Sequence, residues 1–327
     1  MASGRANFSL SGPSQLKAID WLNEHHRRSI AASLVQGVYV LERDRQKNRE
    51  GHQVCCAPPW WGSFHFRLNH RLIDDVDGSI FGAIYEFAIN TSSAHHSQLQ
   101  NAPNYVIAFR GTLNTPPCCS NRFNSQRREV DHKDLLNTKL HGSSRFKLAM
   151  KFVNDTVERI GPNIWLTGHS LGSAMALIAG KELTMKGYLI ETYLFNPPFL
   201  STPEEIVKGR NPKPGKQDPF TALCSWTPHL FVNPNDVLCS EYKGYFEHRK
   251  KMEEIGAGKI ERISTKNSIV CLLSSLVPNM SCEPLHLLPS AYLTINLRPC
   301  SDFRTAHGIE QWWDPKFNAK VELHQFK

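Results

Sequence analysis

Two spacings of apolar residues run along the chain, and each predicts a different kind of element. Between 143 and 160, apolar residues recur three or four positions apart, which predicts an amphipathic helix ended by Gly161. Continuous apolar runs predict buried strands at 80–87, 105–109, 164–167, 189–195 and 229–232. A stretch of small and apolar residues at 171–186 predicts a further helix. Strands that alternate with helices in this way favour an α/β fold with a mainly parallel central sheet and helices on both faces.

The N-terminal part of the chain has a different character. Residues 14–50 are charged, and their apolar positions follow mostly helical intervals, so they predict one or two helices that end at Gly51. We therefore expect a helical extension over 1–55 and one α/β domain over 56–327. A chain of 327 residues exceeds the usual domain, but α/β folds often use about 250 residues in one domain.

One short string carries the strongest chemical signal. Residues 168–172 read Gly-His-Ser-Leu-Gly and lie between a predicted strand and a predicted helix. In such a G-x-S-x-G turn the serine hydroxyl is exposed, and the two glycines let the helix pack closely against the strand. A serine that merely caps a helix would give the same string by chance, but the flanking strand and helix favour a nucleophile. The string predicts an α/β-hydrolase fold with Ser170 as nucleophile.

The oxyanion of the reaction needs two hydrogen-bond donors. The N–H of Leu171 lies at the start of the predicted helix and is expected to point toward the developing negative charge. A second donor should come from a loop after an earlier strand, and Thr112 follows the predicted strand 105–109. Thr112 is therefore the candidate second donor, with an ordinary strand-ending turn as the alternative.

The acid and the base of this fold follow the nucleophile in the chain. Asp236 lies just after the predicted strand 229–232, where it could orient an imidazole; an Asx turn is the alternative interpretation. The candidate bases are His286, His307 and His324. We favour His307 because its loop contains Gly308 and lies near the C-terminus, from where it can reach back to the sheet.

The net charge and the cysteine content restrict the kinds of binding partner and bound group that we expect. The chain carries 38 Lys and Arg against 30 Asp and Glu, a net charge of +8, which favours anionic surfaces such as acidic lipid headgroups. The basic residues are scattered without interleaved aromatics, which argues against nucleic-acid binding. Nine cysteines with no C-x-x-C string predict free thiols rather than a disulfide framework or a metal site. The predicted chemistry needs no cofactor.

The sequence shows no membrane-spanning or secretory signal. Charged residues interrupt the first thirty positions, and the longest apolar run, 269–277, is shorter than the roughly 18 residues of a spanning helix. We therefore expect a cytoplasmic protein whose contact with membranes, if any, is peripheral. The oligomeric state is left open.

Taken in order along the chain, these motifs resemble the class 3 lipases, most closely their plant lipase-like members. The resemblance spans roughly 80–315 and rests on Phe-Arg-Gly-Thr at 109–112, His-Gly at 141–142, 168–172, Phe-Asn-Pro at 195–197, Val-Asn with Asp236 at 232–236, and His307. It implies an esterase with Ser170, Asp236 and His307 as catalytic triad and Thr112 in the oxyanion hole. There is no Gly-Asp-Ser-Leu string, which disfavours the other common esterase family.

Three segments depart from the family pattern. A polar and basic loop at 113–139 replaces the short apolar lid of secreted members, so activation at an oil surface is not expected. The family's Gly-Ser-Pro-Arg reads Asn-Pro-Pro-Phe at 196–199. An insertion at about 240–300 holds a charged helix at 245–254 and the apolar run 269–277, and could form a cap, an acyl-binding wall or a partner surface.

The leading functional hypothesis is hydrolysis of a lipid or other acyl ester through an acyl-enzyme. A catalytically silent lipase-like scaffold and an acyltransferase with the same triad are the alternatives. The sequence leaves the substrate open among acylglycerols, galactolipids, phospholipids and small soluble esters. As a working hypothesis, the net charge and the basic loop favour a medium or long acyl chain presented at an anionic membrane.

Overall fold

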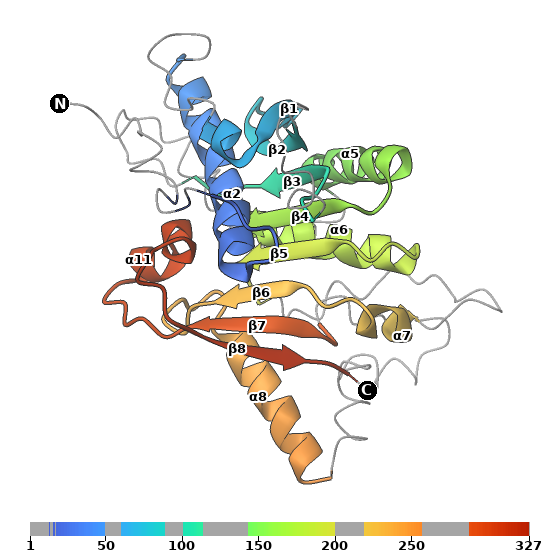
Figure 1. Cartoon of the computed structure of the whole chain (residues 1–327), viewed down its shortest axis with the longest axis vertical. Helices are drawn as coiled ribbons and strands as arrows, with labels where there is room; N and C mark the ends of the chain where they lie inside the picture. Colours follow the sequence, from blue (N-terminus) through green and yellow to red (C-terminus); the bar gives the residue numbers. More distant parts are fainter. Residues whose placement is uncertain are drawn as a thin grey trace.

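A computed structural model describes Pro13, Leu16 and residues 18–49, 60–88, 101–113, 143–199, 219–256 and 288–326. Within these ranges eight strands form one sheet whose spatial order follows the chain (Figure 1). The strands are β1 Phe66–Ile73, β2 Ile80–Phe87, β3 Tyr105–Phe109, β4 Ile164–His169, β5 Glu191–Phe195, β6 His229–Val232, β7 Ala291–Asn296 and β8 Ala319–His324.

The centre of the sheet is parallel and its edges are antiparallel. Strands β3 to β7 pair in parallel with their neighbours. The pairs β1–β2, β2–β3 and β7–β8 are antiparallel. This confirms the predicted α/β fold with a mainly parallel sheet. In a sheet of this kind, the loops at the carboxyl ends of the parallel strands meet at one edge, where functional groups usually gather.

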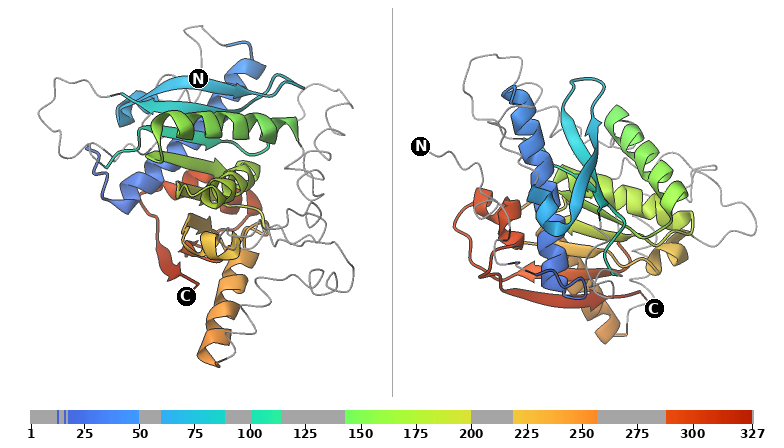
Figure 2. Two further views of the ribbon diagram at one scale, coloured as in Figure 1. Left: turned by 90° about the vertical axis from the view of Figure 1, so that its right-hand side faces the viewer. Right: turned by 45° about the horizontal axis from the view of Figure 1, so that its top comes forward.

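Helices cover both faces of the sheet (Figure 2). Helix α2, Glu24–Gln46, packs on one face against β2 to β5, whereas α5, Ser144–Ile160, and α6, Leu171–Met185, lie on the other. Strand β3 shows why both faces are apolar: Val106 belongs to the core under α2, and its neighbour Ile107 to the core under α5 and α6. Successive side chains of a strand point to opposite faces, so a strand buried on both sides reads as a continuous apolar run.

Helix α2 packs directly against the central strands of the sheet. Asn23 caps it, because its side-chain oxygen accepts hydrogen bonds from the N–H groups of His25 and His26. The helix confirms the helical pattern expected in 14–50, while the domain boundary at residue 55 stays a prediction. Within the described ranges no helix is both long and apolar enough to cross a membrane.

Helices α5 and α6 begin and end close to where the sequence predicts. Ser143 caps α5 by accepting a hydrogen bond from the N–H of Phe146 at 3.1 Å. Gly161, with φ of 87°, ends this helix in a backbone conformation that favours glycine. On α6, Gly180 faces Trp226, and a Cβ there would lie 2.3 Å from the indole ring. The small residues of α6 thus allow close packing.

Several elements were not predicted. They are β1, β7, β8, α7 (Pro219–Cys224), α11 (Phe303–His307) and the short helices η1 (Trp60–Phe64) and η4 (Ile309–Trp312). Helix α8, Glu241–Glu254, starts four residues before the charged helix expected at 245–254. Both α8 and β7 lie inside the span expected as an insertion, 240–300. Residues 114–139 of the basic loop, the apolar run 269–277 and His286 lie outside the described residues.

Candidate active site

Ser170 lies at the turn between β4 and α6 in a strained backbone conformation. Its φ is 54° and its ψ is −123°, values that residues with a Cβ seldom adopt. Its N–H donates a hydrogen bond of 3.0 Å to the carbonyl of Phe195 on the neighbouring strand. A strand, a sharp turn and a helix in this order are the geometry that presents a nucleophilic serine.

The two glycines of the string are required by close packing. A Cβ on Gly168 would lie 2.2 Å from the carbonyl oxygen of Gly172, and a Cβ on Gly172 would lie 2.2 Å from the carbonyl oxygen of Phe109. Distances below 3.0 Å to backbone atoms leave no room for a side chain. Helix α6 can therefore approach β3 and β4 this closely only with glycine at both positions.

The segment after β3 lies beside Ser170. A Cβ on Gly111 would be 2.7 Å from Cβ of Ser170, so the two backbones are in direct contact. The buried Arg110 fixes this segment by donating hydrogen bonds of 2.7 Å to the carbonyls of Ile80 and Gly111. Thr112, the next residue, is half-buried. Leu171 follows Ser170 in the chain and is the first residue of α6.

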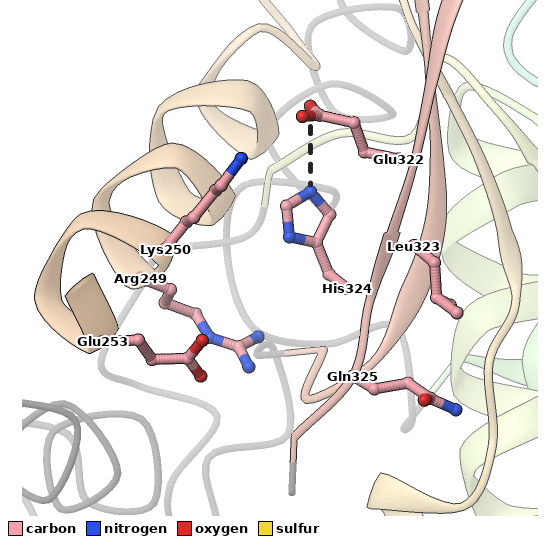
Figure 3. Close-up of a pocket in the computed structure, with 7 residues that line it drawn as sticks. All are labelled: Arg249, Lys250, Glu253, Glu322, Leu323, His324 and Gln325. Atoms are coloured by element: carbon pink, nitrogen blue, oxygen red, sulfur yellow. Dashed lines mark ion pairs between the residues drawn. The ribbon is translucent and has the colours of Figure 1, made fainter.

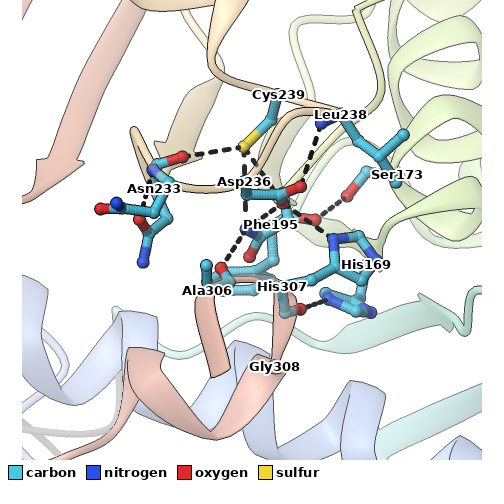
Figure 4. Close-up of polar contacts among 12 residues, drawn as sticks. His169, Ser173, Phe195, Asn233, Asp236, Leu238, Cys239, Ala306, His307 and Gly308 are labelled. Atoms are coloured by element: carbon cyan, nitrogen blue, oxygen red, sulfur yellow. Dashed lines mark hydrogen bonds and ion pairs between the residues drawn. The ribbon is translucent and has the colours of Figure 1, made fainter. Parts of the chain in front are cut away.

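Asp236 and His307 form a hydrogen-bonded pair (Figure 4). Nδ1 of His307 lies 2.8 Å from Oδ2 of Asp236, although 71 positions separate them in the chain. The aspartate is fully buried, whereas the histidine side chain is 19% exposed. Burial alone would raise the pKa of Asp236, but the hydrogen bonds and charge of its neighbours, His307 first, outweigh burial and lower it. The aspartate therefore stays ionised at neutral pH.

Asn196 joins Asp236 to the segment that carries His307, and the sequence analysis did not single it out. Its amide nitrogen donates to Oδ2 of Asp236 at 2.7 Å and to the carbonyl of Ala306 at 3.1 Å. Its oxygen accepts a 2.7 Å hydrogen bond from the indole of Trp312. With φ of 47°, Asn196 adopts a conformation that suits glycine or asparagine, and the family pattern has glycine at this place. The asparagine thus keeps the turn and adds a side chain that braces the pair.

Cys239 also contacts Asp236. Its Sγ donates to Oδ2 of Asp236 at 3.3 Å, and burial together with the aspartate raises the pKa of the thiol well above its usual value. Cys224, Cys239 and Cys300 are free thiols among the described residues. In the part of the chain that the structure describes, no cluster of three His, Cys, Asp or Glu side chains is arranged to hold a metal ion.

His169, the residue before Ser170, connects the Ser170 turn to the segment that carries His307. Nε2 of His169 lies 2.7 Å from the carbonyl oxygen of His307, and the two rings pack at a centroid distance of 4.8 Å. Burial first, and then the charge of His307, lower the pKa of His169 to about 3. His169 is therefore neutral at physiological pH.

Two buried neutral histidines predict acid sensitivity of the fold. Burial lowers the pKa of His229 to about 4, as it lowers that of His169 to about 3. In the unfolded chain both should titrate near 6.5, so below that pH the unfolded state binds protons that the folded state refuses. When the pH falls from 7 to 5, each histidine should therefore lower the free energy of unfolding by about 2 kcal/mol.

Urea unfolding at the two pH values measures this loss. The wild-type protein should lose stability on going from pH 7 to pH 5, and His229→Gln should lose about 2 kcal/mol less than wild type over the same interval. An equal loss in both proteins would show that His229 accepts a proton in the folded state.

A separate pocket of about 510 Å³ lies between α8 and β8 (Figure 3). It is lined by Arg249, Lys250, Glu253, Glu322, Leu323, His324 and Gln325. His324 pairs with Ala291 at the start of β7, whereas Asp236 follows the carboxyl end of β6. Because β6 and β7 are parallel, His324 lies near the amino ends of these strands, whereas Asp236 lies near their carboxyl ends. Of the described candidates, the structure therefore brings only His307 to the aspartate.

One family model, one curated relative and one solved structure are similar to this chain. The family model described as "Lipase (class 3)" matches residues 106–202. A protein of Arabidopsis thaliana named "GDSL esterase/lipase At4g10955" is 44% identical, and the match covers 100% of both chains. That name refers to a Gly-Asp-Ser-Leu string, whereas this chain has His169 before its serine. A crystal structure of a mutant form of MDLA from Penicillium cyclopium is 12% identical with a TM-score of 0.39, covering 93% of this chain and 87% of its own.

Proposed function

We propose that this chain, which belongs to the class 3 lipase family, is a carboxylic-ester hydrolase that works through a serine acyl-enzyme. The single observation that carries the proposal is the hydrogen-bonded pair of the buried Asp236 and the half-buried His307 beside the strained Ser170 turn. In the family, an ester hydrolase or lipase activity is the common chemistry. What we add is the assignment of roles to the residues of this chain.

The proposed first half of the reaction forms the acyl-enzyme. Nε2 of His307 takes the proton of the Ser170 hydroxyl while Oγ bonds to the ester carbonyl carbon. The carbonyl oxygen becomes an oxyanion that accepts hydrogen bonds from the N–H groups of Leu171 and Thr112, and the Thr112 hydroxyl can add a third. The carbon–oxygen bond to the alcohol then breaks, and His307 returns the proton to the leaving alkoxide.

In the second half, water takes the place of the alcohol. His307 removes a proton from water as its oxygen bonds to the acyl carbon, and the proton then passes to Oγ of Ser170 as the acid leaves. Asp236 remains ionised throughout, because its lowered pKa keeps it charged. It orients the imidazole and stabilises the imidazolium that forms twice in each cycle.

Turnover of p-nitrophenyl esters tests the proposal. We expect steady release of p-nitrophenol with a burst that reflects rapid acylation, and addition of methanol should divert part of the acyl group to methyl ester. Absence of turnover with soluble and with dispersed esters would favour the silent scaffold. Transfer to methanol or glycerol with almost no free acid would favour the acyltransferase.

For the substrate, we propose a lipid or other ester with a medium or long acyl chain at an anionic surface. The net charge of +8 and the name of the plant relative, an esterase/lipase, support this choice. Each methylene buried in an acyl pocket should add about 0.8 kcal/mol until the pocket is full. Each basic residue near an anionic surface adds about 1 kcal/mol within a Debye length, so salt should weaken binding.

A chain-length series of esters in vesicles gives the expected pattern. Rates should rise from acetyl to longer chains, should be higher in anionic than in neutral vesicles, and should fall with added salt in the anionic vesicles only. A preference for acetyl esters, or rates that ignore both vesicle charge and salt, would contradict the substrate proposal and leave the reaction type untouched.

A further inference from the structure

One side chain of helix α2, Tyr39, places its hydroxyl in the candidate active site. The Tyr39 side chain is buried, and its hydroxyl accepts a 2.7 Å hydrogen bond from the N–H of Gly111. The same hydroxyl lies 2.7 Å from Nδ1 of His169. Tyr39 therefore touches both the segment after β3 and the turn that holds Ser170.

The direction of every hydrogen bond in this chain of contacts follows from the chemistry of its ends. A backbone carbonyl only accepts, so Nε2 of His169 must carry the proton that bonds to His307. Because His169 is neutral, its Nδ1 then has a lone pair and accepts from the Tyr39 hydroxyl. The oxygen of Tyr39 keeps a lone pair for the N–H of Gly111. Burial raises the pKa of Tyr39, so the hydroxyl keeps its proton.

These bonds fix two consecutive peptide planes beside Ser170. The N–H of Gly111 is held by Tyr39, and the carbonyl of Gly111 is held by the guanidinium of Arg110 at 2.7 Å. In a trans peptide the carbonyl and the following N–H point in opposite directions, so holding the carbonyl sets the direction of the Thr112 N–H. Gly111 has no side chain, and a Cβ there would lie 2.7 Å from the Tyr39 oxygen.

We propose that Tyr39 is a positioning residue for the esterase reaction: its hydroxyl aligns the Gly111–Thr112 oxyanion segment and, through His169, the main chain that carries His307. This inference rests on the proposed function, because it assigns Tyr39 to the same reaction. It makes α2 part of the catalytic apparatus and gives the histidine of the G-x-S-x-G string a role.

A second buried tyrosine provides a matched control. Tyr85 is fully buried on β2, and its hydroxyl donates a 3.1 Å hydrogen bond to the carbonyl of Leu34, also on α2. Tyr39 lies on α2 and Tyr85 bonds to α2 on the same face of the sheet, but the Tyr85 hydroxyl bonds to a helix carbonyl and not to the Ser170 turn. Phenylalanine at either position removes one buried hydroxyl and leaves the ring.

The experiment compares Tyr39→Phe and Tyr85→Phe on one soluble ester. Tyr39→Phe should lower kcat by about tenfold or more and change KM by less than about threefold, because the lost alignment matters mainly in the transition state. Tyr85→Phe should stay within about twofold of wild type. The inhibition constant of a trifluoromethyl ketone, whose adduct with Ser170 carries an oxyanion, should rise for Tyr39→Phe by the same factor as kcat/KM falls.

Variants of His169 test the same chain of contacts if Tyr39→Phe does not fold. Glutamine keeps a donor for the carbonyl of His307, whereas leucine keeps none, so His169→Gln should retain more activity than His169→Leu. Equal kcat values for Tyr39→Phe and Tyr85→Phe, an unchanged inhibition constant, or equal activity of the two His169 variants would overturn the inference. If the wild-type protein shows no ester turnover that depends on Ser170, the proposed function is overturned instead.

Discussion

Replacing Ser170 with alanine is expected to lower ester turnover by a factor of about 10⁴ or more while the fold persists. The variant lacks the oxygen that forms the acyl-enzyme, and no group in the mechanism can replace it. Serine and alanine both carry a Cβ, so the backbone strain at φ of 54° should be similar in the two proteins. Rates with a p-nitrophenyl ester and the thermal unfolding midpoint of both proteins measure the effect. Undiminished activity in a folded Ser170→Ala protein would contradict the assignment.

Replacing His307 with alanine should lower kcat by a factor of about 10³ or more. The change removes the proposed base and leaves the buried carboxylate of Asp236 without its 2.8 Å partner. His324→Ala is the matched control, because His324 lies on β8 near the amino end of β7, away from Asp236. This variant should retain most activity.

His286 is the remaining competitor for the base. An inactive His286→Ala protein together with an active His307→Ala protein would show that the base has been assigned wrongly. The comparison needs all three alanine variants, the same soluble ester, and unfolding midpoints that show each protein to be folded at the assay temperature.

The sequence predicted the centre of the fold because burial on both faces leaves a clear pattern. Strands β2, β3 and β6 lie at the predicted positions, since each is a continuous apolar run whose residues are buried almost throughout. The edge strands left a weaker pattern. Strand β8 is exposed or half-buried along its whole length and carries Lys320 and Glu322, charges that are typical of an edge.

The triad candidates could be found in the sequence because family order and the G-x-S-x-G string restrict them strongly. The residues that brace them could not. Asn196 and Tyr39 are recognisable only from contacts with residues 40 and 72 or more positions away in the chain. A helical pattern predicts that the residues around Tyr39 form a helix, but it does not say which of them faces the serine. Asn196 offered one signal, an asparagine in the place of the family's glycine, which pointed to a positive φ and not to a hydrogen bond with Asp236.

Covalent labelling with a fluorophosphonate tests the central claim most directly. The reagent phosphonylates an activated serine, and trypsin should release Ser170 within the peptide 160–181, which also contains Ser173. Fragmentation of this peptide separates the two serines, and the buried Ser173, whose hydroxyl donates to the carbonyls of Gly168 and Phe195, should stay unlabelled. We predict a single adduct on Ser170 that is absent from Ser170→Ala and is reduced by excess ester. An adduct on another serine, or ester hydrolysis that continues without labelling of Ser170, would contradict the account.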